Sequence, residues 1–163
     1  MRALAALPML MVVTACQAPP AEMTEADYDA IVTEVMDVTD AMMDAWSAFD
    51  VDASMSFFHP EKTSFAWAST IYDFAGLRER WTEVWGTANG QETSWTGRKI
   101  EVLSENAVLF QGSFELKIFY SDGRVVLYPG TAHWTTLLEP LNGHWKITYG
   151  SYAYGGAQTV EGG

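Results

Sequence analysis

The side chains of this sequence that could act as acids, bases or metal ligands are few and scattered. Its three histidines, His59, His133 and His144, lie at no ligand spacing, and no cysteine or close carboxylate cluster accompanies them. The sequence therefore predicts no metal and no other cofactor. His59 and Asp50 are the weak candidates for a general base. Both also have structural explanations, His59 as a hydrogen-bonded turn residue before proline and Asp50 as a helix cap.

The first residues predict that the protein is exported and attached to a membrane. Met1 and Arg2 precede the apolar run ALAALPMLMVV, which is too short for an ordinary transmembrane helix and is typical of a signal peptide. Residues 13–16 (VTAC) resemble the bacterial lipobox. That resemblance implies cleavage after residue 15, lipidation of Cys16 and a lipoprotein anchored to a bacterial cell membrane. Gln17 implies the outer membrane, with the domain facing the periplasm. The plain alternative is an ordinary signal peptide with an incidental thiol.

Charge and cysteine content narrow the choice of partners. The formal net charge is −12, and removal of Arg2 with the signal peptide makes it −13. Nucleic-acid phosphates need a basic patch, so we expect no nucleic-acid partner. Electrostatic docking on anionic lipid is disfavoured for the same reason.

Cys16 is the only cysteine, so no intrachain disulfide can form, and the folded core must be stable without one.

The chain reads as one domain with short appendages. We expect a signal peptide at 1–15, the lipidated cysteine and a proline-containing tether at 16–23, a folded domain at 24–154 and a disordered tail at 155–163. Hydrophobic spacing and caps predict a long helix over 24–49, a short helix over 53–58 and a third helix over 74–85, ended by a turn at 86–90. Short strands are expected at 63–67 and 71–72, and long strands at 94–103, 107–120, 124–139 and 144–154.

The segment 107–120 (AVLFQGSFELKIFY) is the strand around which the domain is organised. Its even positions are apolar or glycine, and polar residues stand at odd ones, which is the period of a strand with one buried face. A strand of about 14 residues far exceeds the usual length of roughly 5–6 residues, so it must twist and curve. We therefore expect a concave sheet that the helices fill, leaving a dry hollow.

Which residues of the later strands point to the inner face of the sheet depends on one irregularity. A two-residue turn at Asp122-Gly123 would place Thr135 and Leu137 on the inner face. The more apolar residue pairs of these strands would then lie on the outer face. A bulge at Pro129-Gly130 reverses the alternation. The residues then expected on the inner face are Trp134, Thr136, Leu138, Trp145, Ile147 and Tyr149, with His133 outside.

Arg98 has two alternative placements. It can lie on the inner face opposite Gly112, whose missing side chain leaves room, and hold an anionic group of a ligand. Alternatively, Gly97 forms a bulge, Arg98 points to solvent, and Trp95 takes the inner position.

The order of these segments is similar to a known superfamily. The segment WSAFDVDASMSFF, the step from Tyr72 to Gly76 before the third helix, and the GHWKI step at 143–147 together resemble the NTF2-like superfamily, in particular its SnoaL-like (DUF4440-type) branch. The resemblance covers nearly all of residues 24–154. It implies an α+β cone, in which a strongly curved antiparallel or mixed sheet wraps around three N-terminal helices and leaves a pocket at one end.

Three functions remain open, because this fold hosts isomerases, dehydratases, cyclases and proteins without known chemistry. The leading expectation is a non-catalytic, lipid-anchored domain that binds a small apolar or weakly anionic ligand. The first alternative is an isomerase, dehydratase or cyclase with a pocket His or Asp as base, and the second is a homodimeric interaction module that pairs through the outer sheet face. The residues expected to line the pocket are Trp46, Phe58, Tyr72, Trp81, Trp85, Arg98, Phe110, Phe114, Trp134 and Tyr149.

Overall fold

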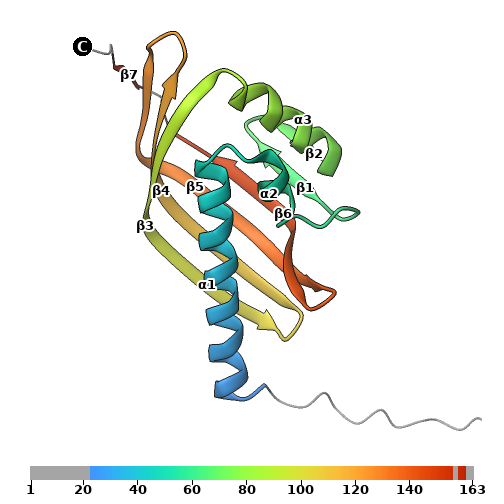
Figure 1. Cartoon of the computed structure of the whole chain (residues 1–163). Coiled ribbons are helices and arrows are strands. Elements are labelled where there is room, and N and C mark those ends of the chain that lie inside the picture. The colour runs from blue at the N-terminus through green and yellow to red at the C-terminus, as the bar shows by residue number, and fades with distance from the viewer. Residues whose placement is uncertain (1–22, 156–157, 161–163) are drawn as a thin grey trace, which may run out of the picture.

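The computed structural model of the protein describes residues 23–155 and 158–160 (Figure 1). Its helices are α1 (Glu25–Ser47), α2 (Val51–Met55) and α3 (Phe74–Trp85). Its strands are β1 (Ser64–Trp67), β2 (Thr70–Tyr72), β3 (Ala88–Ser104), β4 (Ala107–Tyr120), β5 (Val125–Leu141), β6 (His144–Ala153) and β7 (Gln158–Val160). The predicted signal peptide, Cys16 and most of the tether lie outside the described residues.

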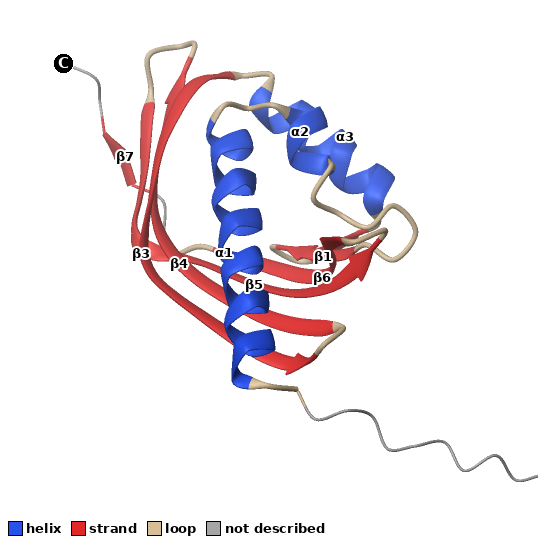
Figure 2. Ribbon diagram, turned by 60° about the horizontal axis from the view of Figure 1, so that its bottom comes forward, coloured by secondary structure: helices blue, strands red, loops and turns tan. Residues whose placement is uncertain are grey.

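The strands form one strongly curved mixed sheet with the order β2-β1-β6-β5-β4-β3. Neighbouring strands run antiparallel except β1 and β6, which run parallel. Figure 2 shows α1 lying along the concave side of the sheet, with α2 and α3 beyond one end of α1. This is the α+β cone that the sequence predicts. None of the helices in the described part of the chain is long and apolar enough to cross a membrane.

Side-chain caps start all three helices; α1 and α3 begin as predicted, whereas α2 covers Val51–Met55 rather than 53–58, because Asp50 caps it two residues earlier than expected. Thr24 and Asp27 form a reciprocal capping box at α1, and Asp50 caps α2 by accepting the backbone N–H of Ala53 at 2.9 Å. Asp73 caps α3 through the N–H of Gly76 at 2.8 Å. The caps satisfy backbone donors at the helix starts, so the helices begin at defined residues. The buried side of α1 then carries Val35, Thr39, Met42, Met43 and Trp46 toward the sheet.

The β4–β5 hairpin reaches the predicted facing by a different route. Its turn has three residues, because Tyr120 and Arg124 are joined by a backbone hydrogen bond across it. Farther along, Leu116 pairs with Tyr128 and Phe114 with Ala132, so one residue of β4 stands opposite three of β5, 129–131. The predicted turn was one residue too short, and the predicted bulge was also one residue too short. The two errors cancel, and Trp134 is 2% exposed while His133 lies outside.

The expected inward orientation of Tyr149 is wrong. Leu138 pairs with Ile147 and Leu137 with Tyr149, so Thr148 is an extra residue in β6 and reverses its alternation. Trp145 and Ile147 are buried as predicted, whereas Tyr149 is 52% exposed on the outer face. Gly150 and Tyr152 take the inner positions beyond the bulge.

Two further differences concern the ends of strands. β3 begins at Ala88 rather than near residue 94, because Asn89 and Gly90 form an irregular start of the strand instead of a free turn. The tail, expected to be disordered, contributes β7, which pairs with residues Val125, Val126 and Leu127 of β5. This edge of β5 is therefore covered where β6 no longer reaches it.

Candidate functional site: an aromatic cleft at the open end of the cone

The deep part of the cone is filled by side chains, so the expected dry hollow is nearly closed. Phe110 and Phe114 are fully buried and Phe58 is 2% exposed. Between the described residues of this part, a small space of about 10 Å³ remains, which we call the inner void. Its lining is aromatic and consists of Trp46, Phe65, Trp67, Trp81, Trp134 and Tyr152.

A larger space opens where α3 faces β3, β4, β5 and the end of β6. This space, which we call the mouth cleft, has a volume of about 370 Å³. It is open to solvent and shares Trp46, Trp67 and Tyr152 with the inner void, so the void lies directly beneath its floor. Its lining is Trp46, Trp67, Arg80, Glu83, Val84, Trp85, Thr87, Gln91, Leu116, Ile118, Tyr120, Tyr128, Tyr152 and Tyr154.

Three tyrosines form one wall of the mouth cleft. Tyr154 contacts both Tyr128 and Tyr152, with ring centroids 4.9 Å and 5.1 Å away. Burial, with the nearby Tyr120 and Tyr154, raises the pKa of Tyr128 to about 12. Burial also raises the pKa of Tyr152, and Tyr128 and Tyr154 add to that rise. The hydroxyls of Tyr128 and Tyr152 therefore stay protonated at neutral pH and can serve as hydrogen-bond donors to a ligand, but not as bases.

The charged groups of the mouth cleft neutralise one another. The Arg80 guanidinium donates to the Glu83 carboxylate at 2.7 Å and lies 5.3 Å from the centroid of Trp67. Gln91 donates its amide N–H to the backbone oxygen of Trp46 at 2.9 Å. Glu83 is the one carboxylate among the residues that line the cleft, and it is paired. The cleft thus offers aromatic surface and hydroxyl donors but no free base.

The two candidate bases stand apart from this cleft and have structural partners. His59 is buried, and its Nδ1 accepts the backbone N–H groups of Glu61 and Lys62 at 3.1 and 3.2 Å. Its own backbone N–H donates to Ile147 at 2.9 Å, which ties the turn to β6. Asp50 is occupied as the cap of α2. Neither residue lines the mouth cleft or the inner void.

Arg98 combines features of both predicted placements. It pairs with Gly112 in the sheet, yet Gly97 lies in a register shift and Trp95 occupies the space over Gly112. The Arg98 guanidinium stacks on Trp95 and forms an ion pair with Asp40 of α1. It is therefore held at the side of α1 and does not line the mouth cleft.

The remaining predicted pocket residues are divided among three places. Trp46 and Trp85 line the mouth cleft, and Trp46, Trp81 and Trp134 line the inner void. Phe58, Phe110 and Phe114 belong to the packed core, while Tyr72 packs partly buried against it. Sequence patterns did not predict a place in the cleft for Arg80, Gln91, Tyr120, Tyr128, Tyr152 or Tyr154. The available signal was Gly150, since a small residue in a predicted strand interior often marks a bulge or a close backbone approach.

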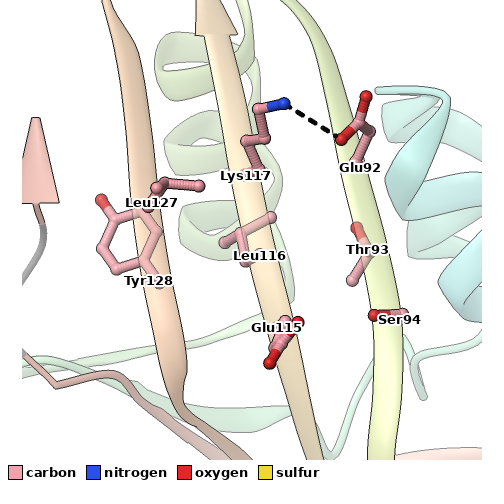
Figure 3. A pocket seen from close by; sticks show the side chains of 8 residues that line it. All are labelled: Glu92, Thr93, Ser94, Glu115, Leu116, Lys117, Leu127 and Tyr128. Carbon is pink, nitrogen blue, oxygen red and sulfur yellow. Dashed lines mark hydrogen bonds and ion pairs between the residues drawn. The ribbon is translucent and has the colours of Figure 1, made fainter. Parts of the chain in front are cut away.

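A second depression, of about 360 Å³, lies on the outer side of β3, β4 and β5 (Figure 3). Glu92 and Lys117 form an ion pair of 3.3 Å across it, and Figure 3 shows Glu115 farther along the same surface. Within the part of the chain that the structure describes, no three metal-binding side chains come together. Leu116 and Tyr128 line both this depression and the mouth cleft, so the sheet is a thin wall between them.

Known structures share this architecture at low sequence identity. In sequence comparisons, no family model and no curated protein matches the chain. The hexachlorocyclohexane dehydrochlorinase LinA-type3 from Novosphingobium barchaimii LL02 is similar at a TM-score of 0.72 and 15% identity, over 85% of this chain and 96% of the other.

Two NTF2-like proteins are also similar. One, from Salmonella enterica serovar Typhimurium LT2, has a TM-score of 0.67 and 14% identity over 79% of this chain and 94% of its own. The other, from Shewanella oneidensis MR-1 and of unknown function, has a TM-score of 0.60 and 16% identity over 75% and 98%. Together with the curved sheet wrapped around α1, these likenesses show that the chain has the NTF2-like fold.

Proposed function

We propose that the protein is a lipid-anchored NTF2-like domain of the SnoaL-like branch that binds a small, largely apolar ligand in the mouth cleft without transforming it. The observation that carries this proposal is the cleft itself. Its volume of about 370 Å³ falls within the range of roughly 300–1,000 Å³ typical of small-molecule sites. An aromatic lining with a few hydroxyl and amide groups is also what such sites use to bind and orient a ligand.

The chemistry of the lining favours a ring-containing ligand that is uncharged or weakly anionic. The faces and edges of Trp46, Trp85 and the three tyrosines suit offset or edge-to-face contacts with a ring. The tyrosine hydroxyls and Gln91 can meet one or two polar atoms. A strongly charged ligand would lose its hydration on entering the cleft. Arg80 is already paired with Glu83, so no free counter-ion in the cleft would compensate for the free-energy cost of that loss.

The position of the cleft fits an anchor on Cys16. The helix α1 has 23 residues, which at about 1.5 Å per residue spans roughly 35 Å. Its first residue, Glu25, follows the tether, whereas Trp46 near its last turn lines the mouth cleft. Figure 1 shows α3, beside the cleft, at the opposite end of the molecule from the start of α1. An anchored domain would therefore open its cleft toward the aqueous phase, which for an outer-membrane lipoprotein is the periplasm.

An enzymatic role is less well supported than binding. LinA-type3 is named as a dehydrochlorinase, and such a reaction removes a proton from the substrate. In the mouth cleft of this chain, the groups that could accept a proton are Glu83, which is paired with Arg80, and tyrosines whose pKa is raised. His59 and Asp50 lie elsewhere, where Nδ1 of His59 accepts two backbone N–H groups and Oδ1 of Asp50 accepts one as a helix cap. We therefore favour a binding protein over an isomerase, dehydratase or cyclase.

Isothermal titration of the full chain with the bicyclic probes 2-ethylnaphthalene and 2-acetonaphthone tests this proposal. We expect saturable binding, and we expect Tyr154→Ala to weaken it about tenfold because an aromatic pair contributes about 0.5–1.5 kcal/mol beyond its area. Tyr149→Ala is the matched control, since that ring is exposed on the opposite face of the sheet. Absence of binding by both probes, or equal losses in both variants, would contradict the proposed site.

A further inference from the structure

The oppositely charged side chains of the mouth cleft lie one turn apart on α3. Arg80 and Glu83 are three residues apart, so they share a face of the helix, and Val84 lines the cleft beside them. The Arg80 guanidinium donates an N–H to Glu83 Oε2 at 2.7 Å, and its Cζ atom lies 5.3 Å from the ring centroid of Trp67. Trp67 belongs to the floor that the cleft shares with the inner void. The guanidinium is therefore held over the floor of the cleft.

Apart from Glu83, Arg80 has the features of a carboxylate-binding site. A guanidinium that stacks on an aromatic face and presents a fork of N–H donors matches the planar geometry of a carboxylate. The Arg80 side chain is 38% exposed and the Glu83 side chain 71%, so the cation is the more shielded of the two. Glu83 therefore approaches from the solvent side and occupies the cation that a ligand carboxylate would need.

The charge balance of the cleft opposes an anionic ligand. Among the described residues that line the cleft, Arg80 and Glu83 are the ones with an ionic charge at neutral pH. Arg124 lies over the ring of Tyr120 at 4.8 Å, but it is paired with Asp122 at 2.6 Å. A ligand carboxylate would have to displace Glu83 from Arg80 and would then lie beside an unpaired carboxylate of the chain, and such like-charge contacts discriminate against a ligand. An uncharged ligand leaves the ion pair intact.

We propose that Glu83 is a specificity-determining residue, which keeps carboxylate ligands out of the mouth cleft by occupying Arg80, so that the cleft selects uncharged ring compounds. This inference rests on the proposed function and names the residue that sets its ligand class. With Glu83 in place, Arg80 is a paired cation on the ring of Trp67. Without the Glu83 carboxylate, Arg80 becomes a carboxylate-binding site. One substitution should therefore change the charge of the preferred ligand and leave the aromatic wall as it is.

The test compares two probes of similar shape, the neutral 2-acetonaphthone and the anionic 2-naphthoate, by isothermal titration of the full chain at neutral pH. We expect the unsubstituted chain to prefer the ketone. In Glu83→Gln, the affinity for 2-naphthoate should rise about fivefold, as expected for one ion pair at a partly exposed site, and the affinity for the ketone should stay within about twofold. The gain should shrink at high salt, because salt screens exposed charges.

Two further variants isolate the role of the pair. Glu79→Gln is the matched control, because it removes the same charge from an exposed position of α3 that does not line the cleft. It should leave the affinity for 2-naphthoate nearly unchanged. The double variant Arg80→Gln/Glu83→Gln should lose the gain of Glu83→Gln, because the guanidinium that would hold the carboxylate is gone. Circular dichroism of each variant verifies that it is folded.

The outcomes separate the two proposals. If neither probe binds to any of the chains, the proposed function fails and this inference fails with it. If the ketone binds but Glu83→Gln gains no more affinity for 2-naphthoate than Glu79→Gln does, the cleft binds ligands and Glu83 does not select their charge. The same conclusion follows if the unsubstituted chain binds both probes equally well, or if the double variant keeps the gain. A gain found in Glu83→Gln alone supports the inference.

Discussion

The ring of Trp95 in β3 lies directly over Gly112 in β4, so that a Cβ atom at Gly112 would come within 2.3 Å of the ring carbon Cζ3. The ring also contacts Phe110 and Phe114 edge-to-face, at 5.5 and 5.6 Å. The absence of a side chain at Gly112 therefore makes room for a tryptophan from the neighbouring strand. Arg98, which pairs with Gly112 in the sheet, lies over the same Trp95 ring and forms an ion pair with Asp40.

We predict that Gly112→Ala destabilises the domain by about 1–3 kcal/mol, the usual cost of overpacking a filled core. The added methyl would have to displace Trp95 or Phe110, and both rings are held by further aromatic contacts. Urea unfolding followed by far-ultraviolet circular dichroism measures the change. Gly97→Ala is the control: no atom of the described residues lies within 4 Å of its Cβ position, so we expect a change within about 0.5 kcal/mol. Equal losses in the two variants would show that Trp95 moves freely.

His59 gives a prediction that separates structure from catalysis. His59→Ala removes the acceptor for the N–H groups of Glu61 and Lys62, and we expect a loss of about 1–3 kcal/mol in unfolding free energy. His59→Asn should retain most of the stability, because an asparagine side chain accepts the same backbone N–H groups in an Asx turn. Urea unfolding measures both variants.

The same two variants should bind 2-acetonaphthone as tightly as the unsubstituted chain, since His59 lines neither the mouth cleft nor the inner void. Calorimetric titration provides this comparison. If a folded His59→Asn variant no longer binds the probe, or lacks a turnover that the unsubstituted chain shows, then His59 takes part in function and not only in stability.

Alternation along β4 was enough to predict most of the fold. The even positions of 107–120 face inward as expected, and the requirement to bury Leu138 and Ile147 correctly predicted an irregularity in β5, which also turns Trp134 inward. The burial preference determined the parity of the strand, although the length of the turn and of the bulge were each misjudged by one residue. Burial is a property of the whole sheet, whereas turn length depends on local backbone angles such as the positive φ of Gly123.

The site was harder to predict because it depends on irregular positions and on packing. The extra residue Thr148 turns Tyr149 outward and Tyr152 inward, and no alternation pattern announces it. Likewise, the abundance of aromatic residues suggested a hollow, but edge-to-face contacts such as that of Phe58 with Trp81 fill it. Composition predicts how much aromatic surface exists, not whether the rings leave space between them.

The anchor is tested by Cys16→Ser. If residues 13–16 act as a lipobox, the unsubstituted chain expressed in a bacterium should incorporate radiolabelled palmitate and enter the detergent phase of a Triton X-114 separation. Cys16→Ser should do neither, because the hydroxyl cannot take the place of the lipidated thiol. Gln17→Asp is the control, since it should keep the label and change only the membrane in which the protein is found. If the unsubstituted chain takes up no palmitate, the lipobox interpretation is wrong and an ordinary signal peptide remains as the explanation of this segment.

Raised tyrosine pKa values predict a loss of stability at alkaline pH. Tyr128 ionises near pH 10 in the unfolded chain but at about 12 in the folded one, and the pKa of Tyr152 is raised as well. Between these pH values the unfolded state holds fewer protons than the native state, so the unfolding free energy falls as pH rises. The contribution of Tyr128 is fully present below about pH 10 and is lost as pH approaches 12.

Urea midpoints measured from pH 8 to 11.5 should therefore decline above pH 10, and Tyr128→Phe should make that decline shallower. Tyr149→Phe removes a tyrosine from the outer face and serves as the control for general alkaline effects. Ultraviolet titration at 295 nm should show Tyr128 ionising after the exposed tyrosines. If Tyr128→Phe and Tyr149→Phe decline alike, the hydroxyl of Tyr128 is not shielded from water, and the wall of the mouth cleft is more open than the structure places it.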